Sequence, residues 1–163
     1  MTLYSHSRLS SFEQCPQKFK FAYIDGLERD EETIEAFMGS RVHETLEKLY
    51  QDLRFQKLNS LEELLGFYNS EWEKNWNENV KIVRADYSKE NFREMGQKYL
   101  SGYYETHKPF DASKTIALEE RVLVSISDGS GTIHKLQGYI DRLAYLGNGF
   151  YEIHDYKTAF SLP

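Results

Sequence analysis

This sequence has a single cysteine, no long apolar run and no excess of basic residues. A single cysteine excludes an intrachain disulfide and fits a reducing compartment, so we expect a cytoplasmic protein. No stretch approaches the roughly 18 apolar residues of a membrane span. The opening residues, Met-Thr-Leu-Tyr-Ser-His-Ser-Arg, lack the apolar core of a signal peptide. The sequence therefore predicts no membrane association.

The charge balance is acidic. Lys and Arg number 20 against 26 Asp and Glu, which gives a net charge of −6. Because a cationic surface drives the passive coating of nucleic acid, this balance argues against a coat protein. It does not argue against a nucleic-acid enzyme, since a metal site built from carboxylates adds negative charge that its cation neutralises. A local basic groove can also coexist with an acidic surface.

The spacing of apolar residues changes from helical to alternating along the chain. Hydrophobic residues make up 40% of the 163 residues, enough for one domain with a core. Helical spacing predicts helices that begin near Ser7, Pro16, Gly39, Leu61 and Lys89. Alternation predicts strands over 115–126, 133–146 and 150–158. We expect a single α+β domain over 1–163, mainly helical over 1–110, with a three-stranded antiparallel meander over 115–160.

The last two predicted strands flank Gly147-Asn148-Gly149, a strong hairpin signal. A turn centred on Asn148 places Asp141 directly across from Asp155, with Lys157 on the same face as Asp155. Opposed residues have Cβ atoms about 5 Å apart, so the two carboxylates can share one divalent cation beside an ammonium. The alternative is a solvated salt-bridge cluster, and a one-residue slip in register would move Asp141 to the other face.

His43 is the second candidate for chemistry. By helical spacing it lies beside Leu46 and Tyr50, toward the body of the protein. A lone histidine in such a place is usually a core or boundary residue. If its helix packs on the carboxylate face, the imidazole becomes a third ligand for a cation. Gly39 would then permit a close approach at the start of the helix.

These residues form a series of motifs with a known counterpart. The series is Gly39-x-x-x-His43, Gly138-x-Ile-Asp141 and Asp155-Tyr-Lys157, preceded by an opening segment over 4–23 that contains Cys15-Pro. It resembles the motifs of RecB-like nucleases in the PD-(D/E)XK superfamily, and is similar to AddB-type nuclease domains and CRISPR-associated exonucleases. The resemblance spans nearly the whole chain in the right order, and implies a partial restriction-endonuclease-like core.

The resemblance implies a role for each site residue. Asp141 and Asp155 would bind Mg²⁺ or Mn²⁺, His43 would be an extra metal ligand, and the backbone carbonyl of Tyr156 would complete the shell. Lys157 would orient or deprotonate the attacking water, or stabilise charge on the phosphorane. The implied reaction is hydrolysis of a DNA phosphodiester by a water that the metal activates.

The implied function is a metal-dependent, exonuclease-like DNA nuclease in recombination, repair or CRISPR adaptation, with a possible helicase or CRISPR adaptation partner. The alternative is a truncated or degenerate nuclease fold that binds DNA or protein without cleaving it. A third option is a different metal-dependent phosphoesterase with a nucleotide substrate. Relatives usually continue past the lysine with a Gln-x-x-x-Tyr helix, which this sequence lacks, so we expect a fragment of a longer protein.

Cys15 matches the first cysteine of relatives that carry a 4Fe-4S cluster. The other three cysteines would follow Pro163, so this chain alone cannot form a four-cysteine cluster. The favoured interpretation of Cys15 is a small buried hydrophobe in a helix pair.

Other candidates are weaker. Arg8, Lys18 and Arg41 could line a DNA groove, although scattered surface cations are the commoner explanation. Either Glu119 or Glu120 must face the site side of its strand. Glu120 is the candidate to assist the metal, against the alternative of a solvated strand end.

Overall fold

The computed structural model describes residues 3–27 and 30–158, and the chain falls into two compact units. The three-helix unit comprises residues 30–118 and those from 141 onward. The hairpin unit comprises the residues up to 29 and residues 119–140. Two long strands, β4 (Lys114–Ser127) and β5 (Ile133–Gly147), pass from one unit to the other. Each unit therefore brings together segments that are distant in the sequence.

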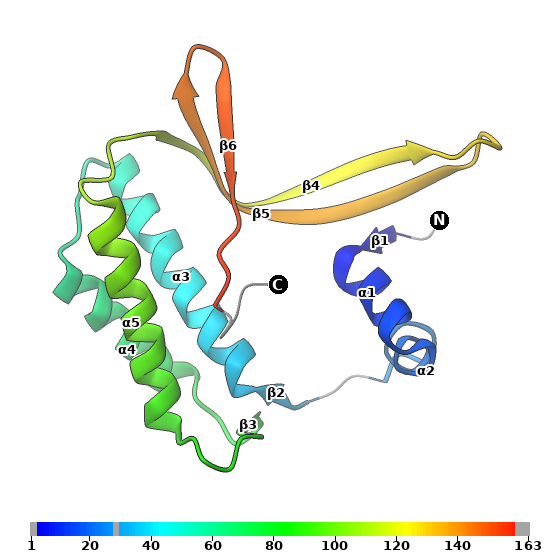
Figure 1. Ribbon diagram of the computed structural model, residues 1–163, viewed down its shortest axis with the longest axis horizontal. Helices are drawn as coiled ribbons and strands as arrows, with labels where there is room; N and C mark the ends of the chain where they lie inside the picture. Colours follow the sequence, from blue (N-terminus) through cyan, green and yellow to red (C-terminus); the bar gives the residue numbers. More distant parts are fainter. Residues whose placement is uncertain (1–2, 28–29, 159–163) are drawn as a thin grey trace. The chain divides into compact units, whose positions relative to one another are not determined.

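Three long helices form the first unit: α3 (Ile34–Arg54), α4 (Leu61–Asn75) and α5 (Lys89–His107). They pack against one another (Figure 1). Each begins after a hydroxyl residue, Thr33, Ser60 or Ser88, whose side chain accepts a hydrogen bond from a backbone N–H of the first turn. At Ser60 and Ser88 the third helical residue returns the bond, which completes a capping box. The helices predicted from Leu61 and Lys89 are confirmed.

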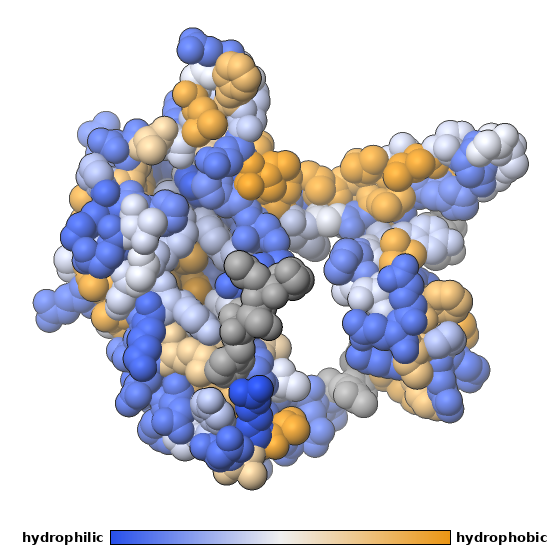
Figure 2. Space-filling model, in the orientation of Figure 1, coloured by the Kyte–Doolittle hydropathy of each residue, from blue (hydrophilic) through white to orange (hydrophobic). Residues whose placement is uncertain are grey.

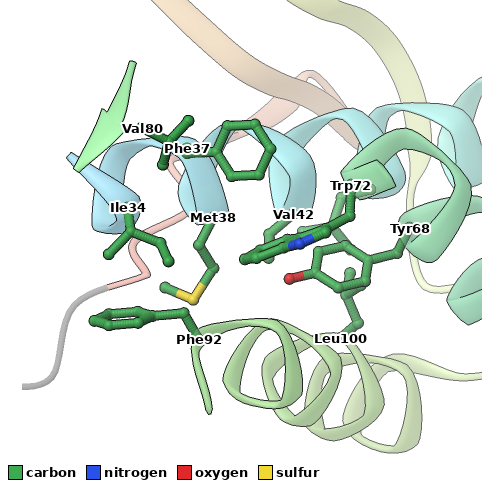
Figure 3. Packing of buried hydrophobic residues seen from close by; sticks show 10 residues of the cluster. Ile34, Phe37, Met38, Val42, Tyr68, Trp72, Val80, Phe92 and Leu100 are labelled. Atoms are coloured by element: carbon green, nitrogen blue, oxygen red, sulfur yellow. The ribbon is translucent and has the colours of Figure 1, made fainter. Parts of the chain in front are cut away.

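The main core fills the space between these helices. Its side chains project from α3, α4, α5 and the short strand β3 (Val80–Lys81) toward a common centre (Figure 3). Trp72 and Tyr68 of α4 are the largest fully buried side chains, and Phe37 of α3 meets the Trp72 ring edge to face at 5.0 Å. Aromatic pairs of this kind add to the free energy that burial contributes. The face of α3 that carries Val42 and Leu46 is thus one of the faces that build the core.

Gly96 permits the close approach of α5 to α4. A Cβ atom at this position would collide with the hydroxyl and ring of the buried Tyr68. Glycine inside a helix costs roughly 1 kcal/mol relative to alanine, so its presence here reflects packing rather than helix propensity.

The predicted hairpin register is confirmed within the three-helix unit. Strand β6 (Phe150–His154) pairs antiparallel with β5, and Leu143 lies opposite Ile153. The turn residues 147–149 all have positive φ, as a tight hairpin requires. The ladder ends where Arg142 pairs with His154, so the prediction of a strand continuing to residue 158 is wrong. A short parallel pair, β2 (Glu32–Thr33) with β3, was not predicted.

The hairpin unit begins with a short strand and three short helical segments: β1 (Leu3–Ser5), α1 (His6–Gln14), α2 (Pro16–Phe19) and the π-helical η1 (Lys20–Ile24). Pro16 starts α2 as predicted, and Gly26 follows the last segment with φ of 67°. Strand β1 pairs in parallel with β5, with Tyr4 opposite Leu136. At the tip of the hairpin, Asp128 Oδ1 accepts hydrogen bonds from the backbone N–H groups of Ser130 and Thr132, which fixes the turn between β4 and β5.

The α+β class is confirmed, and all three predicted strands are present. The sheet order is β1-β5-β4, with β6 also paired to β5. The prediction of a three-stranded antiparallel meander missed one strand. The parallel strand β1 makes the sheet four-stranded and mixed. Within the described residues, no helix combines the length and apolar character needed to cross a membrane.

The hairpin unit leaves many apolar side chains in contact with solvent. Figure 2 shows apolar side chains along the β4–β5 hairpin. Leu123 is 61% exposed and Ile133 is 53% exposed, and Phe12 and Ile24 of the helical segments are also exposed. Among the described residues, no hydrophobic side chain of this unit is buried.

Candidate metal centre

Asp141 lies on β5, one residue before the last ladder pair with β6. Its side chain is only 10% exposed. Because β6 has already ended, the chain beyond His154 turns its backbone toward this carboxylate, and the amide N–H of Tyr156 donates to Asp141 Oδ2 at 2.6 Å. A charged group with little exposure to water needs such a partner.

His43 lies on α3 and meets the same stretch of chain. Its Nε2 is 2.9 Å from the carbonyl oxygen of Tyr156, and its Nδ1 is 3.7 Å from Asp141 Oδ2. A hydrogen bond to the carbonyl requires the proton on Nε2. Within the three-helix unit, α3 therefore reaches the carboxylate of Asp141, as the interpretation of His43 as a metal ligand requires.

Gly39 explains how the chain passes so close to α3. It lies one turn before His43, inside the helix, so the prediction that it starts the helix is wrong. A Cβ on Gly39 would lie 3.0 Å from Thr158 Oγ1. Four helical residues advance about 6 Å and two extended residues about 6.6 Å, so Tyr156 and Thr158 match His43 and Gly39 in spacing. The Gly39-x-x-x-His43 motif thus holds an extended segment that runs along α3 in the opposite direction.

The donor set fits a hard divalent cation. His43 and Asp141 offer ligand atoms within 4.8 Å of each other. Adjacent ligands of an octahedral ion with bonds of about 2.1 Å lie roughly 3 Å apart, which is close to the 2.9 Å between His43 Nε2 and the Tyr156 carbonyl. A carboxylate, a carbonyl and one imidazole suit Mg²⁺ or Mn²⁺ better than a thiophilic metal.

Asp155 and Lys157 lie just beyond β6 and contact each other. Lys157 Nζ is 2.7 Å from Asp155 Oδ1. The side chain of Lys157 is 61% exposed and that of Asp155 is 60% exposed. Both line a cavity of about 460 Å³ with Tyr103 and Lys98 of α5. The shared face of Asp155 and Lys157 was predicted from strand alternation. The predicted pairing of Asp141 directly opposite Asp155 is not observed, because the ladder ends at Arg142 and His154. Asp141 instead accepts a hydrogen bond from the Tyr156 amide.

The side chain of Tyr156 anchors this backbone. Its ring meets His43 edge to face at 5.7 Å and Tyr103 at 5.6 Å, and Tyr103 Oη is hydrogen-bonded to Tyr50 Oη at 2.7 Å. Burial raises the pKa of Tyr156 to about 12, and burial likewise raises the pKa values of Tyr50 and Tyr103. These tyrosines are therefore neutral hydrogen-bonding groups at physiological pH. Helical spacing marked Tyr50 and Tyr103 as core residues and gave no sign of their contact with the site, whereas Tyr156 was expected at the site only through its backbone carbonyl.

The remaining predicted residues lie elsewhere. Cys15 is exposed, so its interpretation as a buried hydrophobe is wrong; its Sγ caps α2 by accepting from the Lys18 N–H at 3.5 Å. The guanidinium of Arg8 lies over the rings of Phe19 and Tyr23. Lys18 is exposed.

Arg41 belongs to the three-helix unit and is largely held by its neighbours. It pairs with Glu44 at 2.6 Å and packs over Phe37, with 12% of its side chain exposed. Little of this guanidinium is left to face a nucleic acid.

Sequence reasoning missed Arg142, the residue that follows Asp141. Only 3% of it is exposed. Its guanidinium lies over the ring of Tyr50 at 4.1 Å and contacts His154, which in turn lies 3.0 Å from Glu152. Burial, and then the charge of Arg142, lower the pKa of His154, so this histidine favours its neutral form. The sequence signal was the alternation itself, which places residue 142 on the face opposite Asp141.

Comparison with known proteins bears on the same residues. The family described as the PD-(D/E)XK nuclease superfamily matches residues 3–162. That match includes His43, Asp141, Asp155 and Lys157. No curated protein matches the chain in sequence. Members of this superfamily generally hydrolyse phosphodiester bonds and typically use Mg²⁺ or Mn²⁺.

Proposed function

Because the chain belongs to the PD-(D/E)XK nuclease superfamily, we propose that it is a metal-dependent deoxyribonuclease of the RecB-like type. The observation that carries this proposal is the convergence of His43 and Asp141 on the backbone of one residue, Tyr156, next to the Asp155-Tyr-Lys157 motif. A nuclease-type function implies a nucleic acid substrate. The substrate proposed here is DNA. The proposed cleavage is exonuclease-like, and the proposed role is in recombination, repair or CRISPR adaptation.

The proposed metal ligands are His43, Asp141, Asp155 and the Tyr156 carbonyl. The ion would lower the pKa of water and neutralise charge on the phosphate. For His43 to present a lone pair on Nε2, its proton must move to Nδ1, which faces Asp141 Oδ2 at 3.7 Å. Asp155 Oδ1 accepts from Lys157, so Oδ2 is the oxygen left for a ligand.

Lys157 has the proposed role of orienting water or stabilising charge on the phosphate. Its side chain is 61% exposed, and its ammonium is held by Asp155, two residues earlier in the same extended segment. Because the segment is fixed to α3 by Tyr156, the ammonium stays near the ligands without being buried itself. A cation in this position favours the negative charge that accumulates during phosphoryl transfer.

The test is cleavage of end-labelled single- and double-stranded DNA in Mg²⁺ or Mn²⁺. Asp141→Asn and His43→Ala should each lower the rate by more than about a hundredfold, since groups that merely orient ligands are worth about 10- to 100-fold. Lys157→Ala should leave metal binding intact and lower the rate. Lys74→Ala, an exposed lysine of α4, is the matched control. Equal rates for Lys157→Ala and the wild type would refute its assigned role.

The exposed apolar side chains of the hairpin unit favour a second candidate, a module that binds DNA or protein without cleaving it. This candidate predicts DNA or partner binding without cleavage, and no Mn²⁺ bound in calorimetry. A 4Fe-4S cluster at Cys15 remains a prediction for a longer form that supplies three more cysteines.

A further inference from the structure

A second cavity of the three-helix unit is lined by positive charge. It has a volume of about 450 Å³ and lies where the end of α3 meets the start of β4. Its polar lining comes from Tyr50, Arg54, Ser113, Lys114 and Thr115. Among the described residues that line it there are two cations and no carboxylate. Asp155 and Lys157 line the other cavity, so this one is separate from the candidate metal centre.

The buried guanidinium of Arg142 contacts the hydroxyl groups that line this cavity. Arg142 Nη1 donates to Ser113 Oγ at 3.3 Å and is 3.5 Å from Thr115 Oγ1. Arg142 is almost fully buried, its Nε has no partner, and in the described part of the chain no carboxylate pairs with it. The carboxylate of Glu152 reaches Arg142 only through the ring of His154, which lies between them. A buried guanidinium whose counter-ion is not in direct contact is costly. An anion in the adjoining cavity would offset that cost.

The two hydroxyls are well suited to hold such an anion. Each accepts from the guanidinium, so each keeps its own O–H free to donate, and a bond to a cation polarises that O–H further. Lys114 and Arg54 are both exposed. Nη2 of Arg54 donates to the carbonyl of Ile116 at 2.8 Å, which fixes the Arg54 side chain beside β4.

We propose that this cavity binds a phosphate group of the nucleic acid, through the hydroxyls of Ser113 and Thr115 and the ammonium of Lys114. The identity of the ligand rests on the proposed nuclease function, whereas the preference for an oxyanion rests on the lining residues alone. A phosphate held here would position the strand by its backbone, without reading its sequence.

The first experiment measures binding of short fluorescent DNA strands to the full chain in EDTA, so that no cleavage occurs. Lys114→Ala should weaken binding by about tenfold and reduce the slope of log affinity against log salt by about one. Lys114→Glu should weaken it further. Lys74→Ala should leave the affinity unchanged. None of these three changes touches Arg142, so the fold is preserved.

Strands with a 5′-phosphate, a 3′-phosphate or neither distinguish the source of the group. A loss in Lys114→Ala confined to one phosphorylated strand assigns the cavity to that terminal phosphate. An equal loss for all strands assigns it to an internal phosphodiester. Equal affinities of wild type and Lys114→Ala for every strand would overturn the proposal.

Titration with inorganic phosphate gives an independent readout. The amide signals of Ser113, Lys114 and Thr115 should shift in the wild type and should shift less in Thr115→Val. Shifts confined to other residues would overturn the proposal. Phosphate binding without any DNA cleavage in Mn²⁺ would reject the nuclease function and support the phosphate site. DNA cleavage without phosphate binding would reject the phosphate site and support the nuclease function.

Discussion

The two units of this chain bury very different amounts of apolar surface. Among the described residues, every buried hydrophobic side chain lies in the three-helix unit, where Trp72 and Tyr68 are fully buried. In the hairpin unit, Leu123 is 61% exposed and Phe12 is 54% exposed. Because burial of apolar area contributes about 25 cal/mol per Å², the three-helix unit holds most of the hydrophobic stabilisation.

The difference shows where a precise site can be built. His43, Asp141 and Tyr156 all belong to the unit with the core, so packed elements fix the groups proposed to bind a metal. The hairpin unit relies on local interactions instead: the β1–β5 ladder, the turn at Asp128, and the rings of Phe12, Phe19 and Tyr23. Segments with few buried contacts open most readily.

The largest expected effect comes from emptying the core of the three-helix unit. Trp72→Ala should lower the free energy of unfolding by about 3–5 kcal/mol, because it removes a fully buried ring and leaves a cavity. Chemical denaturation measures this change. Phe55→Ala, at a site 84% exposed in the same unit, should change stability by no more than about 0.5 kcal/mol. Similar losses for both would show that this core does not hold the unit together.

A smaller loss is expected from Gly96→Ala. The added methyl collides with the buried Tyr68, and overpacking of this kind costs about 1–3 kcal/mol. Gly66→Ala on α4 is the matched control, because no atom lies within 4 Å of its added Cβ. That control should stabilise the protein by up to about 1 kcal/mol. Thermal melts of both variants check the opposite signs.

Asp52 links stability to pH in the same unit. Hydrogen bonds from Lys48, then from Asn59, lower its pKa to about 2. Asp52→Ala should cost about 1–3 kcal/mol near neutral pH, because the buried Asn59 amide loses its acceptor.

The pH dependence has a definite sign. A depressed pKa stabilises the fold above the unfolded value of about 3.9, and this contribution is lost as pH falls toward about 2. The gap between wild type and Asp52→Ala in urea unfolding should therefore narrow as the pH is lowered across that range. A gap independent of pH would contradict the assigned role of the carboxylate.

The smallest effect is expected in the hairpin unit. Leu123→Ala removes a side chain that is mostly in contact with solvent, so stability should change by no more than about 0.5 kcal/mol. Chemical denaturation beside Trp72→Ala gives the direct contrast. A loss of several kcal/mol would show that this strand is covered in solution and would remove the contrast between the units.

Local patterns predicted much of the fold. Periodicity located α4 and α5, Pro16 marked the start of α2, and the glycines around Asn148 set the register that pairs Leu143 with Ile153. The same patterns failed at strand ends and at β1, because three residues carry too little alternation to identify a strand. Cys15 was wrongly expected to be buried, since a residue between two short helices can face either way.

For the candidate site, the sequence by itself determined the residue types and their order along the chain: a histidine, two aspartates and a lysine. Only the tertiary structure decided that Tyr156 joins His43 to Asp141, that Gly39 admits the passing chain from inside α3, and that Arg142 is buried. His43 and Tyr156 lie 113 positions apart. Packing of α3 against the returning chain brings such residues together, and no local periodicity encodes that contact.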